Sequence, residues 1–362
     1  MQSSVLFESQ DRSVVIIDIP RSLEEAQVLP GQNITRQIVS TEPIATPWSL
    51  PEPKEHDANP VSHSAAIADL MTLEAVKSAL ETAVNNYTGP WCLPRAIRPE
   101  EADTTRSTTK NGSQSQKRKR KHQAVPTPPR MPGNNDVTPT VTHGLSPPFI
   151  PEQSNYLLGT IESQRDTFLR TAPQFNLIVL DPPWPSRSVK RKTDGYSTFY
   201  GINEARALLS QVPVAAHLKP DGLVAVWVTN KAAVADLLTA SGGMFDQWGL
   251  EPIGEFVFDM ESQWRKPWER LLITRKKGSR LGMPITPKVI LAVPDVHSRK
   301  PNLRGLFADV LPLSYQGLEV FARSLTASWW SWGDEALFFQ QRFHWNNTPD
   351  ASTSDEQNVS DC

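Results

Sequence analysis

One tetrapeptide in the sequence has the residue types needed to hold an aromatic amine. Asp181 directly follows the apolar run Leu177–Leu180, and Pro182, Pro183 and Trp184 come next. A carboxylate at a strand end accepts a hydrogen bond from an amino group, and the Pro182 carbonyl accepts a second. Two acceptors aim the nitrogen lone pair at an incoming methyl group, and two prolines stiffen the turn. The pattern predicts an amine clamp, with the Trp184 face stacking on a base.

The alternative interpretation of this tetrapeptide is a stiff turn after a strand, with Trp184 at the rim. We favour the clamp, because a given tetrapeptide is rare by chance and this one follows a buried strand. Open α/β folds bind their ligands at the carboxyl ends of such strands. The sequence contains no GxGxxG loop and no Ser-His-Asp series, and its histidines show no metal-ligand spacing, so no metal site is predicted.

Short apolar runs alternate with helical segments after residue 150, which is the pattern of a parallel sheet with crossover helices. The predicted strands are Leu177–Leu180, Leu223–Val228, Phe256–Phe258, Leu271–Ile273, Val289–Leu291, Leu318–Phe321 and Ala336–Phe339. The predicted helices are one capped by Asn203, one over Ala232–Thr239 and one over Asn302–Val310. We therefore expect an α/β fold with a Rossmann-like, mostly parallel sheet and helices on both faces.

Composition divides the chain into four parts. Residues 1–97 hold a strand-like run at Val14–Ile17 and an amphipathic helical pattern from Ala65 to Val84. Residues 98–146 are rich in Ser, Thr, Pro and Lys, which predicts a disordered linker, and residues 346–362 form a polar tail. Residues 147–345 are the expected catalytic domain. We expect the amphipathic helix to dock on that domain, and the alternative is a protein partner bound through the N-terminal region.

Bulk composition limits the class of protein. The formal net charge is −2, so any nucleic acid must be met by local basic clusters. Two cysteines exclude a disulfide framework, and no apolar run approaches the roughly 20 residues that span a bilayer. No signal peptide is recognisable, and we expect a soluble intracellular protein. The basic run Lys117–Lys121 favours nuclear localisation, the alternative being a nucleic-acid tether.

Asp181–Trp184 resembles the DPPW signature of the MT-A70 family of S-adenosylmethionine-dependent adenine methyltransferases. Further family motifs follow in order: Ser188–Arg191 with Tyr196 and Ser197, Trp227–Asn230, His297–Pro301, Leu318–Arg323 and Trp332–Glu335. The resemblance covers about residues 147–345 and is strongest for the branch called methyltransferase-like protein four. It implies a class I-type methyltransferase fold, S-adenosylmethionine as cofactor, and the N6 amine of adenine in RNA or DNA as substrate.

The resemblance also implies roles for individual residues. Asp181 and Pro182 bind the target amine, and Lys300 pairs with the methionyl carboxylate of the cofactor. The other cofactor-binding residues that it implies are Ile161, Asp181, Glu319, Phe321, Arg323, Asp334 and Glu335. The residues expected to contact nucleic acid are Arg187, Lys190, Arg191, Lys192, Tyr196 and Asn230. Simpler alternatives are an ion pair between Glu319 and Arg323, a solvated surface position for Lys300, and a solvated basic run.

Three positions depart from the family pattern. Asp334 stands where the family usually has Asn, Thr160 stands where an acid is usual, and the segment from Trp248 to Glu255 is short. These departures favour an alternative function, a catalytically inactive nucleic-acid-binding adaptor of the same fold. A second alternative is methylation of the N4 amine of cytosine, because related motifs serve both bases. The intact tetrapeptide at Asp181 favours the adenine methyltransferase.

Overall fold

The computed structural model of the protein describes residues 3–43, 63–97, 146–184, 201–259, 268–279, 285–296, 299–312 and 314–347. Its strands are β1 (Val5–Glu8), β2 (Val14–Ile17), β5 (Asn155–Leu158), β6 (Phe175–Leu180), β7 (Leu218–Val228), β8 (Leu250–Asp259), β9 (Trp268–Lys276), β10 (Lys288–Leu291), β11 (Gly317–Val320) and β12 (Trp330–Gly333). They form one sheet in the order β1-β2-β10-β8-β9-β7-β6-β11-β12-β5. Neighbours are parallel except at β1–β2, β8–β9 and β9–β7, so the predicted mostly parallel sheet is confirmed.

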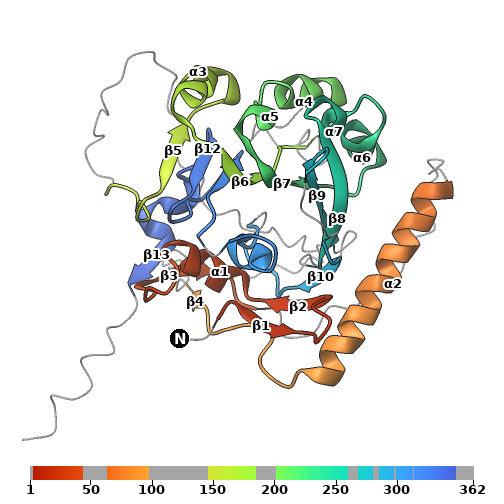
Figure 1. The fold of residues 1–362 in the computed structure, drawn as a ribbon. Helices are drawn as coiled ribbons and strands as arrows, with labels where there is room; N and C mark the ends of the chain where they lie inside the picture. The colour runs from red at the N-terminus through yellow and green to blue at the C-terminus, as the bar shows by residue number, and fades with distance from the viewer. Residues whose placement is uncertain are drawn as a thin grey trace, which may run out of the picture.

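Helices cover both faces of this sheet, as predicted (Figure 1). One face carries α3 (Ile161–Thr171), α4 (Ile202–Leu209), α5 (Val214–His217), α6 (Ala232–Thr239) and α7 (Met244–Gln247). The other carries α1 (Ile19–Ala26) and the 3-10 helix η2 (Arg304–Phe307). In β6, Ile178 and Leu180 pack on the first face, and Leu177 and Val179 pack on the second. Burial on both faces explains why this strand is continuously apolar.

The N-terminal residues are built into the same sheet. Strand β2 pairs in parallel with β10, which places Val14 beside Val289. The carboxylate of Asp18 caps α1 by accepting the Arg21 amide at 2.8 Å, and it also accepts the Leu93 amide at 2.8 Å. Residues before 97 and residues after 146 therefore share one core.

A smaller three-stranded sheet joins the two ends of the chain. It has the order β13-β3-β4, with β13 (Trp345–Asn347), β3 (Arg36–Ser40) and β4 (Ala96–Ile97). Two short 3-10 helices, η3 (Phe338–Gln340) and η4 (Arg342–His344), lead into β13. In Figure 1 this sheet lies beside α1, at the end of the molecule opposite α4 and α6.

The amphipathic helix is α2 (His63–Asn86), which runs along one side of the molecule (Figure 1). Val76, Ala79 and Ala83 are buried against β2, β8 and β10, so the expected docking is confirmed for the second half of the helix, whereas Ile67, Leu70 and Met71 in its first half are exposed. None of the described helices is long and apolar enough to cross a membrane. The predicted linker and tail lie, apart from Ser146, Asn346 and Asn347, outside the described residues.

Three predicted elements are wrong. The expected strand Ala336–Phe339 is a turn followed by η3, because Ala336 and Phe338 donate their amides locally, to Gly333 and Glu335. The expected helix Asn302–Val310 is reduced to η2, because the Asn302 side chain accepts the Arg304 amide at 3.0 Å and stops regular helix formation.

The third correction concerns α4. It begins at Ile202 after Gly201, so Asn203 lies inside the helix instead of capping it.

Candidate active site

A cavity that opens to solvent lies at the carboxyl ends of β6, β7 and β11. These strand ends contribute Asp181, Trp227 and Glu319 to its wall. The segment Arg299–Leu303 and Leu23 of α1 close the opposite side. The position agrees with the rule that open α/β sheets bind ligands beyond the carboxyl ends of their strands.

Two carboxylates share this cavity. Burial raises the pKa of Asp181 to about 6, while the positive charges of Lys300 and Arg323 act in the opposite direction. Burial, and secondarily the charge of Asp181, raises the pKa of Glu319 to about 8. Within the described part of the chain, no hydrogen bond reaches either carboxylate group. Both therefore have acceptor oxygens available to the hydroxyl or amino groups of a ligand.

Lys300 lies in the cavity wall and is not a solvated surface lysine. It forms an ion pair with Glu269 of β9, and its Nζ lies 4.9 Å from the centroid of the Trp227 ring. Only 17% of its side chain is exposed. The lysine thus places a cation beside the two acceptor carboxylates.

Arg323 forms an ion pair with Glu335, whereas the sequence had suggested Glu319 as its partner. Its Nε lies 2.9 Å from a carboxylate oxygen of Glu335, and its Cζ lies 4.5 Å from the Phe338 ring centroid. The alternative of an ion pair between Glu319 and Arg323 is therefore not found. Asp334, next to Glu335, is exposed and does not line the cavity.

The backbone bends sharply where β11 ends. Phe321 has a φ of +63°, a left-handed conformation that bulky residues rarely adopt. The next residue, Ala322, donates its amide to Trp332 of β12 at 3.2 Å. Phe321 lines the cavity, so the strained turn lies at the site itself.

The tetrapeptide is divided between the cavity and the core. Asp181 faces the cavity, but Trp184 is only 6% exposed and packs in the core on the α3, α4 and α6 side of the sheet. The indole N–H of Trp184 donates to the Trp227 carbonyl at 2.7 Å. The prediction that Trp184 offers its face to a base is wrong, because the ring packs on the opposite side of the sheet from the cavity.

Two backbone hydrogen bonds hold the turn that the tetrapeptide forms after β6. The carbonyl of Pro182 accepts the Trp184 amide at 2.7 Å, and the Asp181 amide donates to Val320 at 3.3 Å. A carbonyl oxygen has two lone pairs, so Pro182 retains one acceptor position. Of the two predicted acceptors, Asp181 lines the cavity, whereas Pro182 is buried and is not among the lining residues.

Several predicted site residues are not brought to the cavity. Ile161 is 3% exposed and packs in the core at the start of α3. Thr160 caps that helix, its hydroxyl accepting the Ser163 amide at 3.1 Å. Asn230 follows β7 and donates to the Trp268 carbonyl at 2.7 Å. Arg187, Lys190, Arg191, Lys192 and Tyr196 lie outside the described residues.

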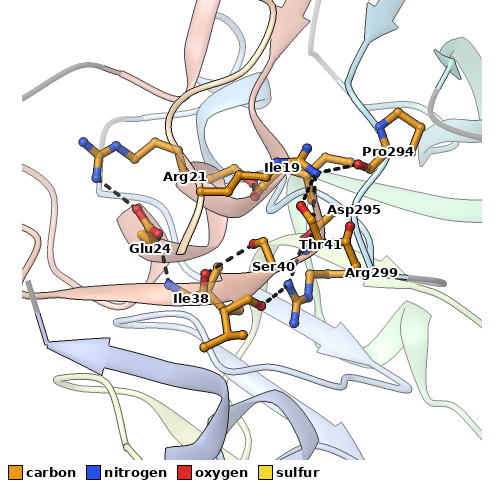
Figure 2. A network of polar contacts seen from close by, with 12 residues as sticks. Ile19, Arg21, Glu24, Ile38, Ser40, Thr41, Pro294, Asp295 and Arg299 are labelled. Carbon is orange, nitrogen blue, oxygen red and sulfur yellow. Dashed lines mark hydrogen bonds and ion pairs between the residues drawn. The ribbon is translucent and has the colours of Figure 1, made fainter. Parts of the chain in front are cut away.

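A buried ion cluster stands behind Lys300. Asp295 pairs with Arg299 at 2.8 Å and lies 3.9 Å from Arg95, and all three side chains are at most 1% exposed. Figure 2 shows Asp295 and Arg299 against Thr41, whose amide donates to Asp295 at 3.3 Å. Asp295 is within ion-pair distance of both guanidinium groups, and the charge of Arg95 also acts on the buried carboxylate of Asp18.

The same cluster anchors the backbone that leads to Lys300. Arg95 donates to the carbonyls of Val293 at 3.0 Å and Pro294 at 2.8 Å. Arg299 donates to the Val39 carbonyl of β3 at 2.9 Å. The N-terminal part of the chain therefore positions one wall of the cavity. Nothing in the sequence around Arg95 signals this role, because its partners are about 200 residues away.

Comparison with known proteins agrees with this site. The family model MT-A70 matches residues 175–335. The "N6-methyladenosine RNA methyltransferase MTA1" of Cryphonectria parasitica is 43% identical over 361 residues, covering 94% of each chain. The chain belongs to the MT-A70 family. The resemblance seen in the sequence is thus confirmed.

Other relatives of this MT-A70 protein differ in how much of it they cover. The "N6-methyladenosine RNA methyltransferase MTA1" of Pyricularia oryzae is 40% identical over 95% of this chain and 97% of its own. The human "N(6)-adenine-specific methyltransferase METTL4" is 30% identical over 57% of this chain and 47% of its own. The fungal similarity thus spans nearly the whole MT-A70 protein, whereas the human similarity covers little more than half of it.

Proposed function

We propose that the protein is an S-adenosylmethionine-dependent methyltransferase that acts on the N6 amine of adenine in RNA. The observation that carries this proposal is Asp181, a half-buried carboxylate with open acceptor oxygens at the carboxyl end of β6. It stands in the family's DPPW tetrapeptide and shares its cavity with Glu319 and Lys300.

The residues of the cavity fit S-adenosylmethionine. Glu319 has acceptor oxygens suited to hydroxyl groups, Lys300 is a cation suited to a carboxylate, and Trp227 and Phe321 provide apolar walls. When bound, the cofactor supplies an electrophilic methyl group.

The protein's own contribution is to prepare the nucleophile. The Asp181 carboxylate accepts one N–H of the adenine amine, and the Pro182 carbonyl accepts the other. The nitrogen lone pair is thereby turned out of conjugation with the ring and towards the methyl group. Alkylation of the amine releases a proton, and Asp181, whose pKa is about 6, can accept it at its oxygen.

Support for RNA comes from the two fungal relatives, which match almost the entire chain and are both named as RNA methyltransferases. An adenine amine inside a duplex is paired and stacked, so the base must be single-stranded or flipped to reach a cavity. DNA is the competing substrate, because a relative from Caenorhabditis elegans is named "DNA N6-methyl methyltransferase".

The test is incubation of the purified protein with methyl-labelled S-adenosylmethionine and matched RNA and DNA oligonucleotides, followed by mass spectrometry of the nucleosides. Labelled N6-methyladenosine from RNA, absent with Asp181→Asn, supports the proposal. Labelled N6-methyldeoxyadenosine alone moves the substrate to DNA, and N4-methylcytosine overturns the choice of base. Absence of label together with absence of cofactor binding in calorimetry indicates the inactive adaptor.

Nuclear localisation through Lys117–Lys121 is part of this proposal, although these residues lie outside those the structure describes. A fluorescent fusion of the full chain should accumulate in nuclei, and replacement of the five residues by glutamine should abolish the accumulation. An unchanged distribution contradicts the assignment.

A further inference from the structure

Two arginines from distant parts of the chain contact the same aromatic ring. The Cζ atom of Arg36, in β3, lies 3.9 Å from the centroid of the Phe149 ring. The Cζ atom of Arg342, in η4, lies 4.6 Å from the same centroid. Arg342 is exposed and Arg36 is half-buried, so both guanidinium groups lie at the surface.

Among the described residues, this pair has no acidic partner. In the part of the chain that the structure describes, no carboxylate lies within ion-pair distance of either arginine. Burial, and secondarily the charge of Arg342, lowers the pKa of Arg36. Two cations held together without a counter-ion repel each other, and a bound anion would remove that repulsion.

Helix η3 connects the paired arginines to the active-site cavity. The Phe149 amide donates to the Gln340 carbonyl at 2.9 Å, and the Gln340 side chain donates back to the Phe149 carbonyl at 2.6 Å. The residue before Gln340, Phe339, lines the cavity. The ring that carries both arginines is therefore bonded to the 3-10 helix that contributes to the cavity wall.

An exposed aromatic residue adjoins this pair. Phe343 follows Arg342 and is 38% exposed. Arg36 also faces Asn347 in the pairing of β3 with β13. Cations beside an exposed aromatic ring are the combination with which proteins hold single-stranded nucleic acid, the cations contacting phosphate and the ring contacting a base.

We propose that Arg36 and Arg342 form a binding site for a backbone phosphate of single-stranded RNA, with Phe343 contacting an adjacent base. The proposal rests on the proposed function in so far as RNA is the substrate. It gives residues before and after the catalytic tetrapeptide a shared role in holding the strand whose adenine enters the cavity.

A purely structural role for the pair makes different predictions. Arg342 also donates from its Nε to the Pro147 carbonyl at 2.8 Å, so it helps to fix the backbone before Phe149. If stacking and this bond were its whole purpose, mutation would lower the melting temperature and leave RNA affinity unchanged. If the pair binds phosphate, the positive charge itself matters, so lysine should keep the salt dependence of binding even though it cannot stack on Phe149 as arginine does.

The experiment measures binding of the full chain to a fluorescent single-stranded RNA by anisotropy at several NaCl concentrations. Each phosphate contact contributes about 0.7 to the slope of log K against log salt for single strands. We expect Arg36→Gln with Arg342→Gln to weaken binding at least tenfold and to reduce the slope by about 0.7 or more. Arg36→Lys with Arg342→Lys should keep the slope, and so should Lys77→Gln, which removes an exposed cation paired with Glu74 on α2.

An unchanged slope in the double glutamine variant overturns the proposal. So does an equal loss in the lysine and glutamine variants accompanied by a lower melting temperature. Equal competition by an acidic peptide of the same charge overturns the assignment to RNA and indicates a protein partner. The Asp181→Asn variant separates this proposal from the proposed function, because it should bind RNA with the normal slope while its methyl transfer is strongly reduced.

Discussion

Charged side chains border the cavity on two sides, and the two groups are arranged in opposite ways. Behind Lys300, Asp295 is bonded to Arg299 and to the Thr41 amide, and its acceptor oxygens are used within the protein. On the strand side, Asp181 and Glu319 are half-buried in the cavity wall, and among the described residues no donor reaches them. Paired charge fixes the backbone that carries Lys300, whereas unpaired carboxylates keep their acceptors for ligands.

Burial affects the pKa of both cavity carboxylates. It raises the pKa to about 6 for Asp181 and to about 8 for Glu319. A buried carboxylate without donors is costly to ionise, and such costs are typical of functional sites. The same Asp→Asn substitution should therefore have different consequences on the two sides of the cavity.

The largest expected effect is on catalysis. Asp181→Asn keeps the shape of the side chain but loses the charge that accepts the amine proton, so kcat/KM should fall on the order of 10²–10³-fold. Its free energy of unfolding at pH 7.5 should not fall, because the charge removed is one that burial disfavours. Methyl transfer rates measure the change in kcat/KM, and urea unfolding measures the free energy of unfolding. Retention of most activity would show that Asp181 is not the acceptor.

An Asp→Asn substitution at Asp295, behind Lys300, should lower the stability of the protein. Asp295→Asn leaves Arg95 and Arg299 buried without their carboxylate, so the free energy of unfolding should fall by about 3–5 kcal/mol. Urea titration of the variant beside Asp181→Asn provides a matched pair. A loss below about 1 kcal/mol would mean that the buried cluster is not what fixes the Lys300 segment.

The third expected effect is a pH dependence of the reaction. Asp181 must be ionised to accept the amine, so kcat/KM should rise about tenfold per pH unit up to about pH 6 and then level off. The residual activity of Asp181→Asn should lack this limb. A wild-type profile that is flat between pH 5 and 7 would contradict the raised pKa.

The smallest expected effect concerns Glu319. A carboxyl group whose pKa is higher in the folded than in the unfolded protein stabilises the fold at low pH, and that stability is lost as the pH rises through the folded pKa, here about 8. Glu319→Gln cannot ionise, so it should gain stability relative to the wild type between pH 5 and 9. The test is to measure the urea midpoints of Glu319→Gln and the wild type across this pH range. A difference between the two midpoints that does not change with pH would contradict the prediction.

Strong local patterns in the sequence predicted the centre of the fold correctly. The runs that became β6 and β7 are continuously apolar because both faces of the sheet are covered, and Ala232–Thr239 matches α6 at both ends. Helix α3 was missed because only Ile161 and Phe168 of its residues are buried, which leaves little apolar periodicity. Strands β5 and β12 were missed because Asn155 in β5, and Ser331 and Gly333 in β12, leave neither strand continuously apolar.

The sequence predicted those site residues that lie in short, recognisable motifs. Asp181 follows its strand as expected, and Lys300 and Glu319 line the same cavity. Trp184 was assigned to the wrong side of the sheet because spacing along a turn does not reveal on which face a side chain packs. Arg95 and Asp295 could not be found, because their contact joins residues about 200 positions apart with no local pattern at either end.

The pairing of β2 with β10 also limits how early in its synthesis this protein can fold. Val14 emerges from the ribosome some 275 residues before Val289, its neighbour in the sheet. Until then the hairpin β1–β2 lacks β10, its parallel neighbour in the sheet, and the segment that carries Lys300 has not been synthesised. Contacts of such long sequence separation make folding slow. Synthesis of nearly the whole chain must therefore precede assembly of its active site.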